Sequence, residues 1–140
     1  MTPTFIDTNI LVYAYDADAG DKHLIAQKIL KECWENESGY LSTQVLQEFY
    51  VAVTNARKLA SPVSSRSARN VINAYHEWTV YRPNVEDIIV ASELGERYRY
   101  SFWDSLVIIA AQNLGVRTLL SEDMQDGQRI GLVTIVNPFK

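Results

Sequence analysis

The chain has 140 residues, of which 47% are hydrophobic and 21% are charged. This composition is typical of one soluble domain whose core is large enough to fold without disulfides or a structural metal. Its single cysteine, Cys33, excludes an internal disulfide and a multi-cysteine zinc site. Because no apolar run is long enough to span a membrane and no signal peptide is evident, we expect a cytoplasmic protein that does not bind membranes.

The net charge of −4 argues against a protein that binds nucleic acid over its whole surface. The charge is unevenly distributed, however, because no acidic residue occurs from Phe49 to His76. The basic residues of this segment are Arg57, Lys58, Arg66 and Arg69. Two interpretations of the segment remain open, a local basic face and an ordinary solvated helical surface.

The first predicted element is a short apolar strand that ends at Asp7 and then becomes helical, from Ile10 to Tyr15. An open α/β sheet presents an acid in this way at the carboxyl end of a strand, in the crevice where ligands bind. The polar loop at residues 16–21 differs from a calcium loop, because its glycine is in the wrong place and the final glutamate is missing. A helix follows, with Asp21 as its N-cap.

A second short strand, Gly39 to Ser42, precedes a helix that we expect Thr43 to cap. Glu48 lies in this helix, beside its apolar stripe. A glutamate at such a position is usually only a helix former, and its interest here comes from the other acids of the chain. After a break near Pro62, a further helix is predicted to run to about Glu77.

A third short strand, Thr79 to Arg82, and another helix lead to a cluster of aromatic residues. Exposed aromatic side chains can stack on nucleic-acid bases, but we expect Phe102 and Trp103 to pack against the core, which is the commoner arrangement. Asp104 follows at the start of an almost wholly apolar helix, for which Asp104 and Ser101 are competing N-caps.

The last two predicted strands are Thr118 to Ser121, followed directly by Glu122 and Asp123, and Leu132 to Val136. Strands and helices thus alternate throughout the chain. This alternation predicts a single α/β domain, with a mainly parallel sheet of about five short strands and helices on both faces.

Four acids occur at the edges of predicted elements: Asp7, Glu48, Asp104 and Asp123. If the first strand and the strand before Asp123 are neighbours at the switch point of the sheet, their acids converge. Clustered carboxylates repel one another unless a cation neutralises them, and oxygen ligands without His or Cys select hard cations such as Mg²⁺ or Mn²⁺. Phosphodiester hydrolysis is the chemistry that such a site suits.

The motifs around these acids resemble those of the PIN-domain ribonucleases, and within that family the VapC-like toxins of bacterial toxin–antitoxin pairs. They are Phe5-Ile6-Asp7-Thr8-Asn9, the Gln47-Glu48 helix, Phe102-Trp103-Asp104 and Leu120-Ser121-Glu122-Asp123-Met124. Four spaced motifs in the right order, covering essentially the whole chain, are a strong signal where one alone would be weak. The resemblance implies a single PIN domain over residues 1–140.

The family pattern further implies that the four acids hold the metal, with Asp7 and Asp104 the surest ligands. It implies that Asn9 and Ser121 orient carboxylates or water, with Asp126 as an accessory acid, whereas Glu122 is expected to point away. The family also implies endonucleolytic cleavage of RNA, a homodimer and a small antitoxin that covers the active site. The residues that we expect to grip the RNA are Arg57, Lys58, Arg66 and Arg69.

Three other interpretations remain open. The first is a PIN-like module that binds RNA or protein without cutting. The second is a Mg²⁺-dependent phosphatase or another phosphotransfer enzyme, although no GxxxxGK[ST] loop and no lysine beside the motifs is present. The third is a purely structural role for the four acids, as helix caps and surface residues.

Overall fold

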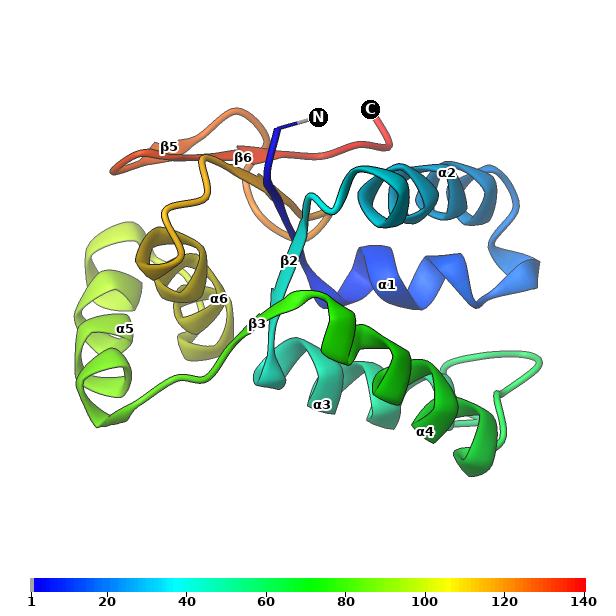
Figure 1. Ribbon diagram of the computed structural model, residues 1–140. Coiled ribbons are helices and arrows are strands. Elements are labelled where there is room, and N and C mark those ends of the chain that lie inside the picture. Colours follow the sequence, from blue (N-terminus) through cyan, green and yellow to red (C-terminus); the bar gives the residue numbers. More distant parts are fainter. Residues whose placement is uncertain (1) are drawn as a thin grey trace.

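The computed structural model describes residues 2–140. The elements of this part, with two short 3-10 turns at Ala17–Ala19 and Tyr75–Glu77, are β1 (Thr4–Ile6), α1 (Thr8–Ala14), α2 (Asp21–Asn36), β2 (Gly39–Ser42), α3 (Thr43–Val53), α4 (Ser65–Ala74), β3 (Thr79–Tyr81), α5 (Val85–Tyr98), α6 (Phe102–Asn113), β4 (Thr118–Leu120), β5 (Arg129–Ile130) and β6 (Val133–Val136). The sheet lies between α1 to α4 on one side and α5 and α6 on the other (Figure 1). The predicted α/β class is therefore confirmed.

The described strands form one sheet in the order β3-β2-β1-β4-β6-β5. All neighbours are parallel except β5 and β6, which are antiparallel. The prediction of about five strands omitted β5, which has only two residues and therefore shows no hydrophobic periodicity.

The strand order reverses at β1, with β2 and β3 on one side of it and β4 and β6 on the other. β1 and β4 are parallel neighbours, and Ile6 is paired with Leu120 at their carboxyl ends. The residues that follow these two strands, Asp7 and Ser121, are therefore brought together although 114 positions separate them. This is the crevice in which α/β sheets bind ligands.

The starts of α2 and α3 differ in detail from the prediction, and that of α6 decides between two predicted caps. The N-cap of α2 is Gly20, without a side-chain cap, and not Asp21. Ser42, and not Thr43, is the N-cap of α3, since its side chain accepts a hydrogen bond from the backbone N–H of Val45. At α6 the N-cap is Ser101, which accepts from the backbone N–H of Asp104 at 3.1 Å. Asp104 is thereby not needed as the cap of α6.

A second feature of the core is the aromatic cluster of Trp34, Tyr75 and Trp78, which lies near the start of β2. Neighbouring ring centroids in it are 4.8 to 5.4 Å apart. The Trp78 ring occupies the place that a side chain at Gly39 would need, because a Cβ built there lies only 2.4 Å from the ring. The smallest residue is thus required at this position of β2.

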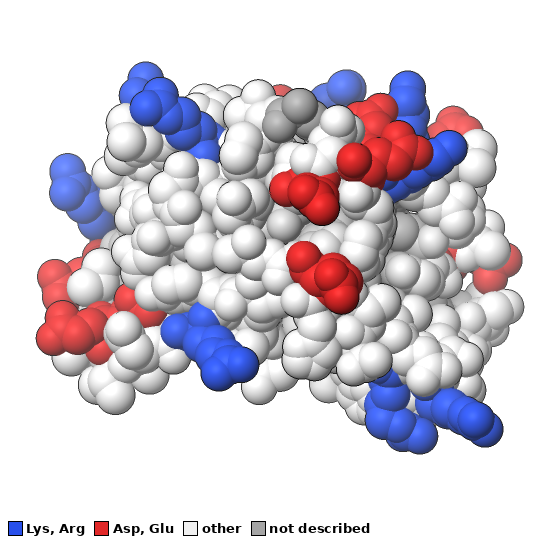
Figure 2. Space-filling view, in the orientation of Figure 1, with Lys and Arg blue, Asp and Glu red and all other residues white. Residues whose placement is uncertain are grey.

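Charged side chains of one sign gather at two places on the face that Figure 2 shows. In the view of Figure 2, acidic side chains gather at the lower left, over α5, and basic ones at the lower right, over α4. The basic side chains of α4 are Arg66 and Arg69, and both residues are exposed. None of the helices in the described part of the chain has the length and apolar character that crossing a membrane requires.

Candidate active site

Asp7 lies immediately after β1 and is the N-cap of α1. Asp7 is only 4% exposed, and both of its carboxylate oxygens accept hydrogen bonds. Oδ1 accepts from the backbone N–H of Thr8 at 2.7 Å, and Oδ2 accepts from the hydroxyl of Ser121 at 2.7 Å. The carboxylate is therefore fixed both by the first residue of α1 and by the residue that follows β4.

Glu48 lies in the second turn of α3 and is fixed in a similar way. Its Oε1 accepts from the hydroxyl of Thr8 at 2.7 Å, and its Oε2 accepts from Nε2 of Gln44 at 3.3 Å. The same Gln44 nitrogen donates to the backbone carbonyl of Trp103 at 3.0 Å. Neither Thr8 nor Gln44 was predicted to orient Glu48, although Gln44 stands four positions before it, where helical side chains meet.

The remaining two acids reach the site from the C-terminal half of the chain. Asp104 lies in the first turn of α6. Asp123 follows β4, and its Oδ2 accepts a hydrogen bond from Nδ2 of Asn9 at 2.9 Å. The Asn9 amide also accepts from the backbone N–H of Glu122 at 3.2 Å, so it ties the start of α1 to the segment after β4.

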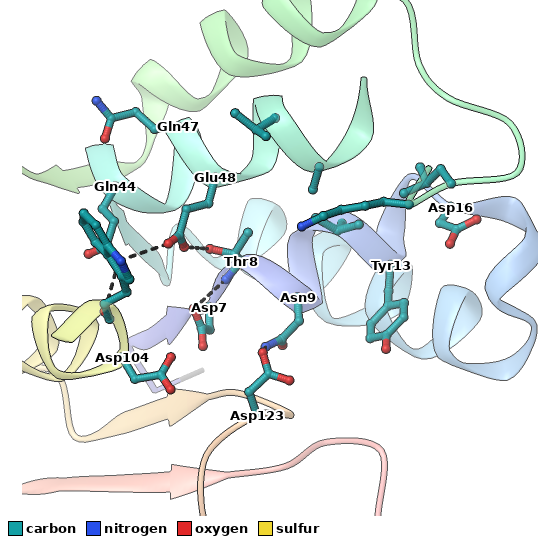
Figure 3. Close-up of a pocket in the computed structure, with 16 residues that line it drawn as sticks. Asp7, Thr8, Asn9, Tyr13, Asp16, Gln44, Gln47, Glu48, Asp104 and Asp123 are labelled. Carbon is teal, nitrogen blue, oxygen red and sulfur yellow. Dashed lines mark hydrogen bonds between the residues drawn. The ribbon is translucent and has the colours of Figure 1, made fainter. Parts of the chain in front are cut away.

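All four predicted acids line one pocket of about 670 Å³. Figure 3 shows Asp7, Glu48, Asp104 and Asp123 around one space, each carried by a different segment. Asp16, which was not predicted as a site residue, lines the same pocket at a distance from them (Figure 3). Among residues 2–140, no three His, Cys, Asp or Glu side chains stand close enough together to hold a metal ion as they are placed.

The electrostatics of the pocket follow from burial and from the proximity of like charges. Burial is the main cause that raises the pKa of Asp7 from 3.8 to about 7, and the negative charges of Asp104 and Glu48 add to it. The hydrogen bonds from Ser121 and Thr8 oppose this increase. The pKa of Asp104 is also raised, by burial first and then by the charges of Asp123 and Glu48.

Two acids close to Asp123 in the sequence do not line the pocket. Glu122 turns away as expected, because its carboxylate accepts from the Tyr13 hydroxyl at 2.5 Å and forms an ion pair with Lys22. Asp126 is exposed, and its carboxylate accepts from the backbone N–H of Asn137 at 2.8 Å. Asp126 therefore lies in the turn before β5, where it contacts the segment after β6, and it is separate from the four acids that line the pocket.

The four basic residues that were predicted to bind RNA do not all lie at the pocket. Lys58 lines the acid pocket, where it is the only lysine or arginine among the lining residues that the structure describes. Arg57 is exposed beside it, whereas Arg66 and Arg69 lie on α4 and do not line the pocket.

The expectation that Trp103 packs against the core is wrong. The residue is 59% exposed and lines the pocket next to Asp104. Phe102 is partly buried and packs against the core, as expected. α6 is buried continuously from Ser105 to Ala111, whereas Trp103 lies in its first turn, before that stretch.

The fold recurs in solved structures of toxins. A toxin–antitoxin complex from Klebsiella pneumoniae matches with a TM-score of 0.66 and 19% identity over 98% of both chains. Mycobacterium tuberculosis VapC20, described as a toxin that cleaves the sarcin-ricin loop, matches with a TM-score of 0.63 and 20% identity over 83% of this chain and 86% of its own. VapBC2 from Rickettsia felis, bound to promoter DNA, matches with a TM-score of 0.64 and 17% identity over 96% of this chain and 97% of its own.

At these identities the likeness establishes the fold alone. At the level of sequence, the chain has no significant match among curated proteins. The sequence profile described as "PIN domain" does match, over residues 4–125, which is most of the chain and includes the four acids that line the pocket. The chain therefore belongs to the PIN domain family.

Proposed function

We propose that this protein is a metal-dependent endoribonuclease that acts as the toxin of a toxin–antitoxin pair. The observation that carries the proposal is the pocket in which four carboxylates from four separate segments face one another. Burial first, and then the negative charges of the neighbouring acids, raise the pKa values of Asp7 and Asp104, and shifted pKa values of this kind are common at functional sites. The toxin relatives, one of them described as cleaving the sarcin-ricin loop, support RNA as the substrate.

The chemistry of the donor set fits a hard divalent cation. Every candidate ligand in the group Asp7, Glu48, Asp104 and Asp123 offers carboxylate oxygen, which is the ligand type that Mg²⁺ and Mn²⁺ prefer. When bound, such an ion would supply the positive charge that activates water and stabilises the leaving oxygen of a phosphodiester. The negative charges of Asp7 and Asp104 are the ones that most need a counter-charge, since burial disfavours both.

The roles of the neighbouring polar residues follow from their hydrogen bonds. Ser121 donates to Asp7, and Asn9 donates to Asp123, so each holds one carboxylate in a fixed direction. Thr8 and Gln44 do the same for Glu48. Asp126 is left out of the proposed site, because its carboxylate is engaged with Asn137.

The proposal is tested by incubating total bacterial RNA with the purified protein in Mg²⁺, in Mn²⁺ and in EDTA, and by sequencing the 5′ ends of the fragments. We expect discrete cuts that require the metal and that disappear in Asp104→Asn. Failure of a folded, metal-binding protein to cut any RNA would instead favour a binding module. Faster cleavage of a mononucleotide phosphate than of RNA would favour a phosphatase.

Lys58 and the arginines of α4 are expected to contribute unequally to RNA binding. Lys58→Glu places a negative charge in the acid pocket and should lower kcat/KM at least about 10-fold, because it repels the phosphate beside the carboxylates. The double variant Arg66→Glu and Arg69→Glu should mainly raise KM, and its KM should depend less on salt than that of the wild type, because fewer phosphate contacts remain. Cleavage assays from 50 to 200 mM salt measure both effects, and unchanged kinetics in all variants would exclude this basic surface from RNA binding.

The proposed partners are a cognate antitoxin and a second copy of the chain, both in the cytoplasm. A toxin–antitoxin complex among the relatives supports the antitoxin, as does an apolar groove between α3 and α4 that adjoins the acid pocket at Gln47 and Val51. The exposed apolar side chains of α5, which include Ile88 and Ile89, support a homodimer. Light scattering of the purified protein checks the second proposal, since a monomer at micromolar concentration would exclude it.

A further inference from the structure

Trp103 is the most exposed tryptophan of the described chain, at 59%, compared with 38% for Trp34 and 8% for Trp78. The other two pack with Tyr75 in the aromatic cluster, whereas Trp103 lies in the acid pocket next to Asp104. An exposed indole at the edge of this pocket presents a large π-face to any ligand that enters it. The residue that sequence patterns assigned to the core thus belongs to the wall of the proposed active site.

The position of Trp103 is fixed on two sides. Its backbone carbonyl accepts the hydrogen bond from Nε2 of Gln44 at 3.0 Å, and its ring packs edge to face against Phe102, with centroids 5.1 Å apart. Gln44 is only 5% exposed, and its Oε1 has no hydrogen-bond partner among the described residues. The fold therefore keeps an incompletely bonded buried amide here, and that amide holds both Glu48 and the backbone of Trp103.

We infer that Trp103 is a stacking platform for an unpaired base next to the scissile phosphate. The inference rests on the proposed function, because the carboxylates define where that phosphate lies. A base stacks on an exposed indole through its π-face, which requires that the base has left a duplex. Lys58, at the same pocket, offers a positive charge for a backbone phosphate.

The first test is a titration of the protein with a short single-stranded oligoribonucleotide, in which tryptophan fluorescence is the signal that reports binding. The Asp7→Asn protein serves as the background, so that the RNA stays intact. We expect RNA to quench the fluorescence, Trp103→Phe to remove most of the quenching while affinity stays within about 3-fold, and Trp103→Ala to weaken binding by about 5- to 150-fold. The same oligonucleotide in a full duplex should bind more weakly than the single strand.

The second test locates the stacked base. With the Asp7 carboxylate restored, a series of substrates with one abasic nucleotide each is scanned across the cleavage site. Removal of the base at one position should raise KM for the wild-type enzyme. The same substrate should not change KM for Trp103→Ala, because that variant has no indole ring on which the base could stack. Trp34→Phe is the matched control, because it changes a tryptophan that does not line the pocket and should behave as wild type.

The outcomes separate this inference from the proposed function. Metal-dependent cleavage with equal kinetics in wild type and Trp103→Ala would overturn the stacking role and leave the nuclease intact. Quenching at Trp103 by RNA without any cleavage would support the stacking role and overturn the nuclease. Normal RNA binding by Trp103→Ala together with weaker inhibition by a protein partner would assign the exposed ring to that partner, and so would also overturn the inference.

Discussion

Replacing Asp7 with Asn is expected to abolish RNA cleavage and, at the same time, to make the metal-free protein more stable above pH 7. The loss of cleavage, about 1,000-fold or more, follows from removing a proposed metal ligand at the centre of the site. The gain in stability follows from burial, which raises the pKa of Asp7 from 3.8 to about 7. Asn fits the same space and can still accept the hydrogen bond from the backbone N–H of Thr8.

The sign of the pH dependence follows from linkage. Since the folded chain binds the Asp7 proton more tightly than the unfolded chain, the free energy of unfolding of the wild type falls as pH rises from about 4 to about 7, and then stays level. Asn does not ionise, so the variant lacks this loss and should be more stable by about 2 to 4 kcal/mol at pH 8. Denaturant unfolding in EDTA, at pH values from 4 to 8, measures the difference.

Two companion variants make this result interpretable. Asp18→Asn removes an exposed carboxylate outside the pocket and should change neither cleavage nor stability by a measurable amount. Ser121→Ala removes the hydrogen bond that lowers the pKa of Asp7, so its metal affinity should fall about 10- to 100-fold. Equal stability of Asp7→Asn and the wild type from pH 4 to 8 would contradict the prediction, because it would mean that ionisation of the buried Asp7 does not lower the free energy of unfolding.

Gly39→Ala is expected to destabilise the protein by about 1 to 3 kcal/mol, although replacing glycine in a strand usually stabilises it. The reason is the Trp78 ring, three atoms of which lie within 2.5 Å of the position where a Cβ would be. Trp78 is only 8% exposed and is packed against Trp34 and Tyr75, so it has little room to move. Thermal unfolding measures the loss of stability.

A double-mutant cycle checks the cause of this effect. Phe at position 78 lacks the part of the indole that the new methyl group meets, so Gly39→Ala should cost less in a Trp78→Phe background than in the wild type. Equal penalties in both backgrounds would contradict the proposed clash. Cleavage by the folded protein should be unchanged, because Gly39 begins β2 and the acid pocket lies at the opposite, carboxyl end of the sheet.

The fold and the position of the four acids were predictable because their signals are local. A short apolar run that ends in an acid, as at Asp7, marks the carboxyl end of a strand, and an all-apolar helix that begins beside Asp104 marks the centre of the domain. What the pattern required in addition, that β1 and β4 be neighbours, is confirmed by the pairing of Ile6 with Leu120. The metal-binding roles of these acids stay predictions.

The parts that were not predictable depend on tertiary contacts. Trp103 carries the same apolar signal as its neighbour Phe102, and only the packing of α6 decides that one is exposed and the other is not. The hydrogen bond between Gln44 and the backbone of Trp103 joins residues 59 positions apart, so no sequence window contains it. Lys58 and Arg66 look alike as charges in one basic segment, but only the first lines the pocket.

The pairing of β1 with β4 also has a consequence for protein synthesis. Asp7 leaves the ribosome early, but Asp104, Ser121 and Asp123 are added more than 90 residues later, and β1 has no neighbour on that side until they arrive. A nascent chain therefore carries two acids of the pocket, Asp7 and Glu48, long before the other half of the site exists. The four acids of the proposed site can therefore come together only when translation of the chain is nearly complete.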